Sequence, residues 1–143
     1  MIRTIMLNTV KTHGDMSCEV KVVRSKDHCV GILRYKAFEA GMISGPDEKS
    51  VLAHFRSICR MIDSEGAIVR EGILMLGYHN GAFGGNVLFV DGEVIGEWHS
   101  DDEEWCHFTA SGTTDVTCSA PSPWMLHDAI ACWARSGNHT SEA

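Results

Sequence analysis

Lysine and arginine are missing from a long stretch of this 143-residue chain, because none occurs between Glu71 and Arg135. Residues 72–143 hold ten carboxylates and one cation, a formal charge of −9, whereas residues 1–71 hold eleven cations and nine carboxylates, a charge of +2. Such a field attracts cationic partners and repels phosphate. Direct nucleic-acid binding by the acidic half is therefore disfavoured, since phosphate contacts supply most of that affinity.

The sequence also lacks a long apolar run, a signal peptide and a Cys-x-x-Cys pair. A membrane-spanning helix needs about 20 apolar residues, and the apolar core of a signal peptide is interrupted here by Arg3, Thr4 and Asn8. We therefore expect a cytoplasmic protein with no membrane association. In a reducing compartment the cysteines are expected to be free and mainly structural; they are Cys18, Cys29, Cys59, Cys106, Cys118 and Cys132.

No complete catalytic signature is present. The densest group of chemically capable side chains is His99, Asp101 or Asp102, Cys106 and His107. Neighbouring strand residues point to opposite faces, so Cys106 and His107 do not converge on one metal ion, and we expect no metal site and no cofactor. An acidic neighbourhood would raise the pKa of the Cys106 thiol and weaken it as a nucleophile.

The pattern of apolar and turn residues predicts one α+β domain over 1–143, with a near-neutral part (1–71), an acidic part (72–143) and a frayed tail (138–143). A central helix is predicted over about 46–65, after the capping segment Ser44–Asp47, and a C-terminal helix over about 123–136, after Ser122. Strands are predicted at 2–10, 18–25, 28–36, 73–78, 87–90, 94–99 and 104–109. A glycine-rich connection is predicted over 77–86.

The acidic strands are predicted to form an antiparallel meander. A two-residue turn at Asp91-Gly92 would place Phe89 opposite Val94 and Leu88 opposite Ile95. A turn centred on Asp101-Asp102 would place Trp98 opposite Trp105 and His99 opposite Glu104. The face expected to form the core carries Val87, Phe89, Val94, Trp98 and Trp105, and Trp133 is also expected in the core.

The opposite face is predicted to be a binding surface, because carboxylates there surround an apolar strip. The acidic anchors are Glu93, Glu97, Asp101, Asp102, Glu103 and Glu104, and the apolar contacts are Leu88, Ile95 and Phe108. Trp124, in the first turn of the last helix, is predicted to be an exposed anchor. This arrangement predicts a non-catalytic protein that docks on a basic, possibly nucleic-acid-binding, surface of a partner protein.

In size, charge and lack of a catalytic signature the chain is similar to small cytosolic inhibitors made by phages and mobile elements, a similarity of profile that no motif carries. Two alternatives stay open. One is a small-molecule or nucleotide-binding protein with a pocket formed by Tyr78, His79, Asn80 and Phe83. The other is a small enzyme with a Cys/His or carboxylate/His site. Homo-oligomerisation through the apolar strip or an edge strand fits all three hypotheses.

Overall fold

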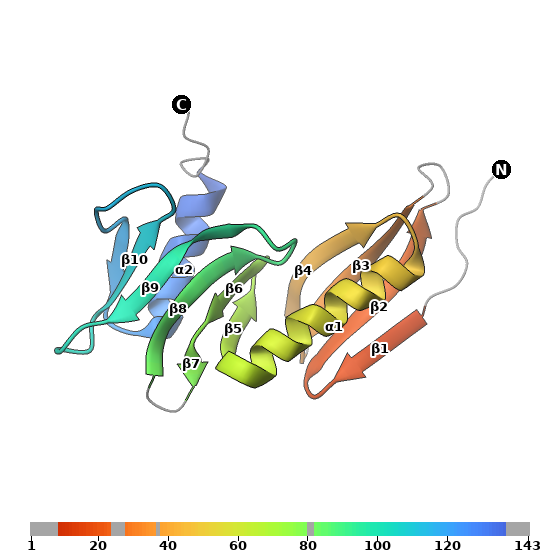
Figure 1. Cartoon of the computed structure of the whole chain (residues 1–143), viewed down its shortest axis with the longest axis horizontal. Coiled ribbons are helices and arrows are strands. Elements are labelled where there is room, and N and C mark those ends of the chain that lie inside the picture. The colour runs from red at the N-terminus through yellow and green to blue at the C-terminus, as the bar shows by residue number, and fades with distance from the viewer. Residues whose placement is uncertain (1–8, 24–27, 37, 80–81, 137–143) are drawn as a thin grey trace. The chain divides into compact units, whose positions relative to one another are not determined.

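The computed structural model describes residues 9–23, 28–36, 38–79 and 82–136, with the backbone alone at 79, 82 and 83. These residues form two helices and two antiparallel sheets, which confirms the α+β class (Figure 1). The chain divides into two compact units, one of residues 1–64 with 69–72 and the other of 65–68 with 73–143. Their boundary lies close to the charge boundary at residue 71. The grouping of both units into one domain stays a prediction.

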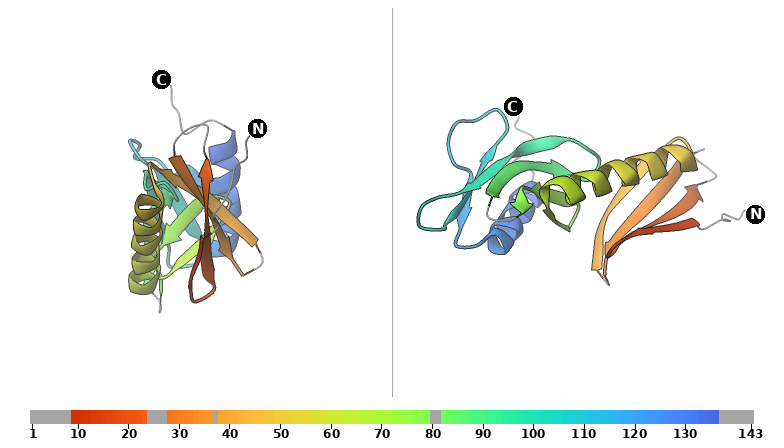
Figure 2. Two further views of the ribbon diagram at one scale, coloured as in Figure 1. Left: turned by 90° about the vertical axis from the view of Figure 1, so that its right-hand side faces the viewer. Right: turned by 60° about the horizontal axis from the view of Figure 1, so that its bottom comes forward.

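The first unit is a four-stranded antiparallel sheet with one helix on one face. Its strands run in the spatial order β1-β2-β3-β4 and comprise Thr9–His13, Met16–Val23, His28–Tyr35 and Phe38–Gly45. Met16, Cys18 and Val20 alternate with more exposed residues along β2, so these three side chains lie on the face that helix α1 covers. Both views in Figure 2 show α1 alongside this sheet.

Helix α1 spans Glu48–Glu65, close to the predicted 46–65. Asp47 caps it, because its Oδ1 accepts a hydrogen bond from the Ser50 amide at 2.8 Å. The predicted apolar stripe faces the sheet, and Val51, Phe55 and Ile58 are buried. A Cβ added at Gly31 of β3 would lie 2.7 Å from a Val51 methyl group. Glycine at this position therefore lets helix and sheet approach closely.

The second unit is a larger antiparallel sheet packed against helix α2, Pro123–Arg135. Its strand order is β11-β10-β9-β8-β6-β5, with β7 paired to β8. In chain order the strands from β5 to β11 are Ala67–Arg70, Ile73–Leu76, Tyr78–His79, Ala82–Phe89, Val94–Ser100, Cys106–Ala110 and Cys118–Ala120. Ser122 caps α2, as predicted, by accepting a hydrogen bond from the Met125 amide. Among the described residues, no helix is long and apolar enough to cross a membrane.

The core of this unit differs from the prediction because the β8–β9 register is shifted. Leu88 pairs with Val94, not with Ile95, and the register slips between Val87 and Leu88. Such a bulge adds a residue to one strand and changes which side chains face inward. Leu88 and Ile95 are consequently buried, whereas Val94, predicted in the core, is exposed.

The β9–β10 connection is also longer than predicted. Trp98 pairs with Phe108 and His99 pairs with His107, so the pairing of Trp98 with Trp105 was wrong. Trp105 lies in the connection and is 45% exposed, although the sequence favoured a core position. Trp98 is buried, as predicted. Trp133 is half-buried and packs edge-on against Phe108, with ring centroids 5.2 Å apart.

Three strands were not predicted: β4, β5 and β11. The glycine-rich segment 77–86, predicted as a connection, contains most of β7 and β8 instead. Glycine is needed here for close approach, because a Cβ at Gly85 would lie 2.7 Å from the Leu76 carbonyl oxygen. Of the predicted first strand, residues 2–8 lie outside the described residues, as do a turn expected at Lys26-Asp27 and the tail 138–143.

Candidate functional site

The strongest chemical site in the second unit, called the acidic unit below, lies around the β9–β10 connection. Among the described residues of 73–136 the carboxylates outnumber the cations nine to one, and Arg135 is that cation. All nine carboxylates are exposed: Asp91, Glu93, Glu97, Asp101, Asp102, Glu103, Glu104, Asp115 and Asp128. Four of them are consecutive, from Asp101 to Glu104, which places the highest local density of negative charge on this connection.

Asp101 organises the connection. Its Oδ1 accepts hydrogen bonds from the backbone amides of Glu103 and Trp105, at 2.8 and 3.0 Å, as aspartate does in tight turns. Its Oδ2 lies 2.7 Å from Nε2 of His107. The pKa of the Asp101 carboxyl lies below its usual value. The main cause is the hydrogen bond from His107, and the hydrogen bonds from the two amides are further causes. Asp101 is therefore an anionic turn residue with both oxygens engaged.

His107 links this turn to the edge of the sheet. It pairs with Ser119 of β11 on one side and with His99 of β9 on the other. Its Nδ1 lies 2.8 Å from the Ser119 hydroxyl, and the His99 and His107 ring centroids are 5.3 Å apart. A carboxylate only accepts hydrogen bonds, so in the neutral imidazole Nε2 donates to Asp101 and Nδ1 accepts from Ser119. The three side chains form a continuous hydroxyl–imidazole–carboxylate chain.

A cavity of about 530 Å³ lies beside Asp101. It is lined by Tyr78, Ser100, Asp101, Glu104 and the segment Pro121–Pro123. The N-terminus of α2 contributes about +0.5 of an elementary charge, which two carboxylates outweigh. The cavity thus favours a cationic or neutral occupant over an anion.

Two exposed aromatic residues adjoin this cavity in the sequence. Trp105 follows the lining residue Glu104 and is 45% exposed, and Trp124 follows Pro123 and is 56% exposed. The exposed position predicted for Trp124 is confirmed. Exposed tryptophans beside carboxylates suit a cationic side chain, because the ring face attracts a cation by about 0.5–2 kcal/mol.

The predicted apolar strip is not on the surface. Leu88, Ile95 and Phe108 are all buried, and Ile95 and Phe108 belong to the core cluster that also contains Leu126 and Ile130 of α2. The β8–β9 bulge and the packing of α2 account for the difference. The acidic anchors predicted with this strip are exposed, but the apolar contacts assigned to them must be replaced.

Only part of the pocket predicted near Tyr78 can be compared with the structure. Tyr78 lines the cavity together with Asp101 and Glu104, two residues that the sequence had assigned to a different surface. Asn80 lies outside the described residues, and so do the side chains of His79 and Phe83. The structure therefore joins one residue of the predicted pocket to two of the predicted acidic anchors.

The thiol candidate Cys106 does not converge with His107. Cys106 is buried, whereas His107 is half-buried on the opposite face, as the strand alternation predicted. In the described part of the chain, no three His, Cys, Asp or Glu side chains are grouped to hold a metal ion. All six cysteines are free. Burial is the main cause that raises the pKa of the Cys118 thiol, so Cys118 is protonated and weakly nucleophilic at neutral pH.

Sequence reasoning missed Ser119. It lies twelve residues after His107 on the short strand β11, which was not predicted, so nothing in the spacing signals their contact. Glu104 was placed opposite His99 and not beside a cavity, because the length of the connection was underestimated. A signal was available there: Asp101 is a residue type that often hydrogen-bonds the amide two positions later, here that of Glu103.

We compared the chain with protein-family models, with curated proteins and with solved structures, and no match was found. The functional argument consequently rests on the residues of this chain.

Proposed function

We propose that the protein is a non-catalytic binding protein that docks on a basic surface of another protein. The observation that carries the proposal is the cavity lined by Asp101 and Glu104 within a unit whose described carboxylates are all exposed. A partner that binds nucleic acid has such a basic surface, and occupying it would inhibit that partner. This is the role we infer for the protein.

The proposed contact has an acidic and an aromatic component. Carboxylates of the β9–β10 connection would steer a basic partner, which raises the association rate more than the final affinity. A lysine or arginine side chain of the partner would enter the cavity beside Asp101 and Glu104. Trp105 and Trp124 would supply the buried apolar contact that Leu88, Ile95 and Phe108 cannot supply. Tryptophan is among the residues most often found at energetic centres of interfaces.

Titration calorimetry with an oligoarginine peptide, at low and high salt, tests this proposal. We expect the native chain to bind and the Glu103→Gln/Glu104→Gln variant to bind at least about tenfold more weakly, a loss of about 1.4 kcal/mol. Asp101 is left intact because it organises the connection. Higher salt should weaken native binding, because exposed charges are screened.

The matched control is Asp115→Asn/Asp128→Asn, which removes the same charge from the same unit outside the cavity lining. We expect this variant to bind nearly as the native chain does. An equal loss in both variants would mean that net charge alone attracts the peptide. That result, or binding that salt does not change, would count against a defined site.

A hydrolytic enzyme is the second candidate, and the Ser119–His107–Asp101 chain is the observation that favours it. In such a step the Ser119 Oγ would attack an ester carbonyl carbon, and His107 would take the hydroxyl proton and pass it to the departing alcohol. Water would then release the acid and restore Ser119. Ser119 contacts Nδ1 here, whereas serine hydrolases use Nε2. This reversal makes binding the first candidate.

Labelling with a fluorophosphonate, followed by mass spectrometry, decides the second candidate. An active hydroxyl would form a covalent adduct at Ser119 in the native chain but not in the His107→Gln variant. The exposed Ser111 provides an internal control for nonspecific reaction. Equal or absent labelling at the two serines would rule the enzyme out.

A further inference from the structure

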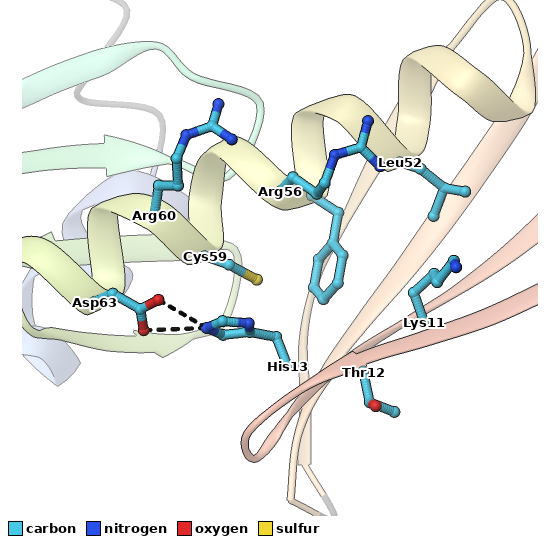
Figure 3. A pocket seen from close by; sticks show the side chains of 9 residues that line it. Lys11, Thr12, His13, Leu52, Arg56, Cys59, Arg60 and Asp63 are labelled. Atoms are coloured by element: carbon cyan, nitrogen blue, oxygen red, sulfur yellow. Dashed lines mark hydrogen bonds and ion pairs between the residues drawn. The ribbon is translucent and has the colours of Figure 1, made fainter.

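A second cavity, of about 330 Å³, lies within the first unit, between strand β1 and helix α1 (Figure 3). Its lining comprises Lys11, Thr12 and His13 from β1 and Leu52, Phe55, Arg56, Cys59, Arg60 and Asp63 from α1. This cleft belongs to the near-neutral part of the chain and shares no residue with the acidic cavity. Neither the proposed binding function nor the hydrolytic alternative involves it.

The strand side of the cleft follows from the sheet register. Lys11 pairs with Cys18 and His13 pairs with Met16, and both partners are buried on the face that α1 covers. Cross-strand partners share a face, so Lys11 and His13 also point to the helix side. Because β1 is the edge strand of its sheet, it places two basic side chains along the border of the core.

The helix side carries two arginines one turn apart. Arg56 and Arg60 are neighbours on the helix surface at spacing i, i+4, where like charges repel by a few tenths of a kcal/mol. Asp63 lies three residues after Arg60, within reach of an ion pair along the helix. Its carboxylate instead meets His13, whose Nε2 lies 2.9 and 3.1 Å from its two oxygens (Figure 3).

Three cations of the cleft have no hydrogen-bond or ion-pair partner among the described residues. Within the described residues, Lys11, Arg56 and Arg60 form no ion pair or hydrogen bond through their side chains, whereas Arg34 and Arg70 are paired with Glu19 and Glu71. With His13 neutral, three cations and Asp63 give the lining a formal charge of +2. Burial raises the pKa of the Cys59 thiol to about 11, so Cys59 adds no negative charge.

The floor of the cleft is apolar. Leu52 is half-buried, and Phe55 and Cys59 are buried against the sheet. Ligand sites combine a mainly apolar lining with a few polar groups that fix orientation, over about 300–1,000 Å³. The cleft lies at the small end of this range, which limits an occupant to about one ring and one charged group. Arginine and lysine side chains carry the charge and the hydrogen-bond donors that suit a phosphate group.

We propose that this cleft binds a small phosphomonoester, with its phosphate held by Lys11, Arg56 and Arg60 and its apolar part against Leu52 and Phe55. Asp63 also lines the cleft, where its contact with His13 would keep its carboxylate engaged. In a protein with a formal charge of −7, this cleft would give one half an affinity for anions that the other half lacks.

Titration calorimetry with phenyl phosphate, inorganic phosphate and phenol tests the assignment. We expect phenyl phosphate to bind with a dissociation constant below about 1 mM, at least tenfold more tightly than either of the other two. A short 5′-phosphorylated oligonucleotide tests whether the phosphate comes from a nucleic-acid end, and we expect no tighter binding than for phenyl phosphate. Tighter binding of the oligonucleotide, or equal binding of inorganic phosphate, would overturn the small-ligand assignment.

The variant Arg56→Gln/Arg60→Gln should weaken phenyl phosphate binding at least tenfold. The matched control, Lys21→Gln/Lys49→Gln, removes the same charge from exposed residues of the same unit outside the cleft. It should leave affinity unchanged within about twofold, since neither lysine lines the cleft and exposed charges are screened by salt. Equal loss in both variants, or no binding by the native chain, would refute the proposal. Circular dichroism spectra should show that both variants retain the native fold.

Discussion

Single residues set the local geometry at the site in the acidic unit. Asp101 accepts three hydrogen bonds within or next to the β9–β10 connection, and Gly77 has a left-handed backbone where two strands approach closely. The connection could be predicted as an acidic turn, but its length could not. Length depends on which donors hydrogen-bond to the Asp101 carboxylate, and one of these is His107, which only the folded sheet brings near.

Replacing Asp101 by alanine should lower stability in a pH-dependent way. The folded pKa of Asp101 lies below its ordinary value of 3.8, so the carboxylate stabilises the fold above that value. This contribution is lost as the pH falls through the lower, folded pKa. Urea denaturation should therefore show a stability difference between native chain and variant that is constant near neutrality and shrinks below pH 3.8.

The neighbouring variant Asp102→Ala is the control, since Asp102 is a carboxylate of the same connection and is exposed like Asp101. It should change stability little and show no comparable dependence on pH. A pH-independent effect of Asp101→Ala would mean that its charge is not what stabilises the connection.

Replacing Gly77 by alanine should destabilise the second unit by at least about 2 kcal/mol. Gly77 has φ of +90°, and an added Cβ would collide with the backbone carbonyl group of Gly84. Gly14 provides the control, because it has φ of +60° with nothing within 4 Å of an added Cβ. Gly14→Ala should cost only about 1 kcal/mol, from backbone strain alone. Thermal unfolding of both variants separates collision from strain, and equal losses would contradict the close approach.

At the scale of elements, both helices could be predicted, whereas three of the eleven described strands could not. The capping residues of α1 and α2 are local in sequence, so the ends of both helices could be inferred within two residues. Strands β4 and β11 depend on partners that lie elsewhere, and they carry no strong alternation of their own. The β8–β9 bulge moved Ile95 inward and Val94 outward. The predicted apolar part of the binding surface was wrong for this reason, although Glu97 and the segment 101–103 were placed on the right strand and turn.

Strand β6 is an anchor for two buried polar side chains. Trp98 donates its indole N–H to the Leu76 carbonyl at 2.6 Å, and His127 of α2 lies 3.1 Å from the Ile73 carbonyl. Both side chains are almost fully buried. These contacts tie β9 and α2 to the same short strand, so β6 joins the two layers of the second unit.

Trp98→Phe should therefore lower the free energy of unfolding by about 1–3 kcal/mol, since it removes a buried hydrogen bond and part of a packed ring. Trp105→Phe changes the same side chain at a 45% exposed position and should cost less than about 0.5 kcal/mol. Urea denaturation of the two variants makes the comparison. Equal costs would mean that the Leu76 contact adds nothing to stability.

For the whole molecule, the sequence divides by charge nearly where the structure divides by contacts. The two proposed sites follow that division: a cationic cleft in the first unit and an anionic cavity in the second. The charge division could be predicted from the sequence, because net charge does not depend on the fold. The cleft could not be predicted, since Lys11 and Arg56 are 45 positions apart in the sequence and come together only through the packing of β1 and α1.

The distribution of cysteines allows the cooperativity of unfolding to be measured by thiol modification. Cys132 is the one exposed thiol of the six. Cys18, Cys29 and Cys59 are buried in the first unit, and in the second Cys106 is buried and Cys118 is half-buried. A thiol reagent should thus modify Cys132 first, and mass spectrometry should then time the opening around each remaining cysteine. Simultaneous modification of the two groups would show that both units unfold as one body, and separate rates would show two independent bodies.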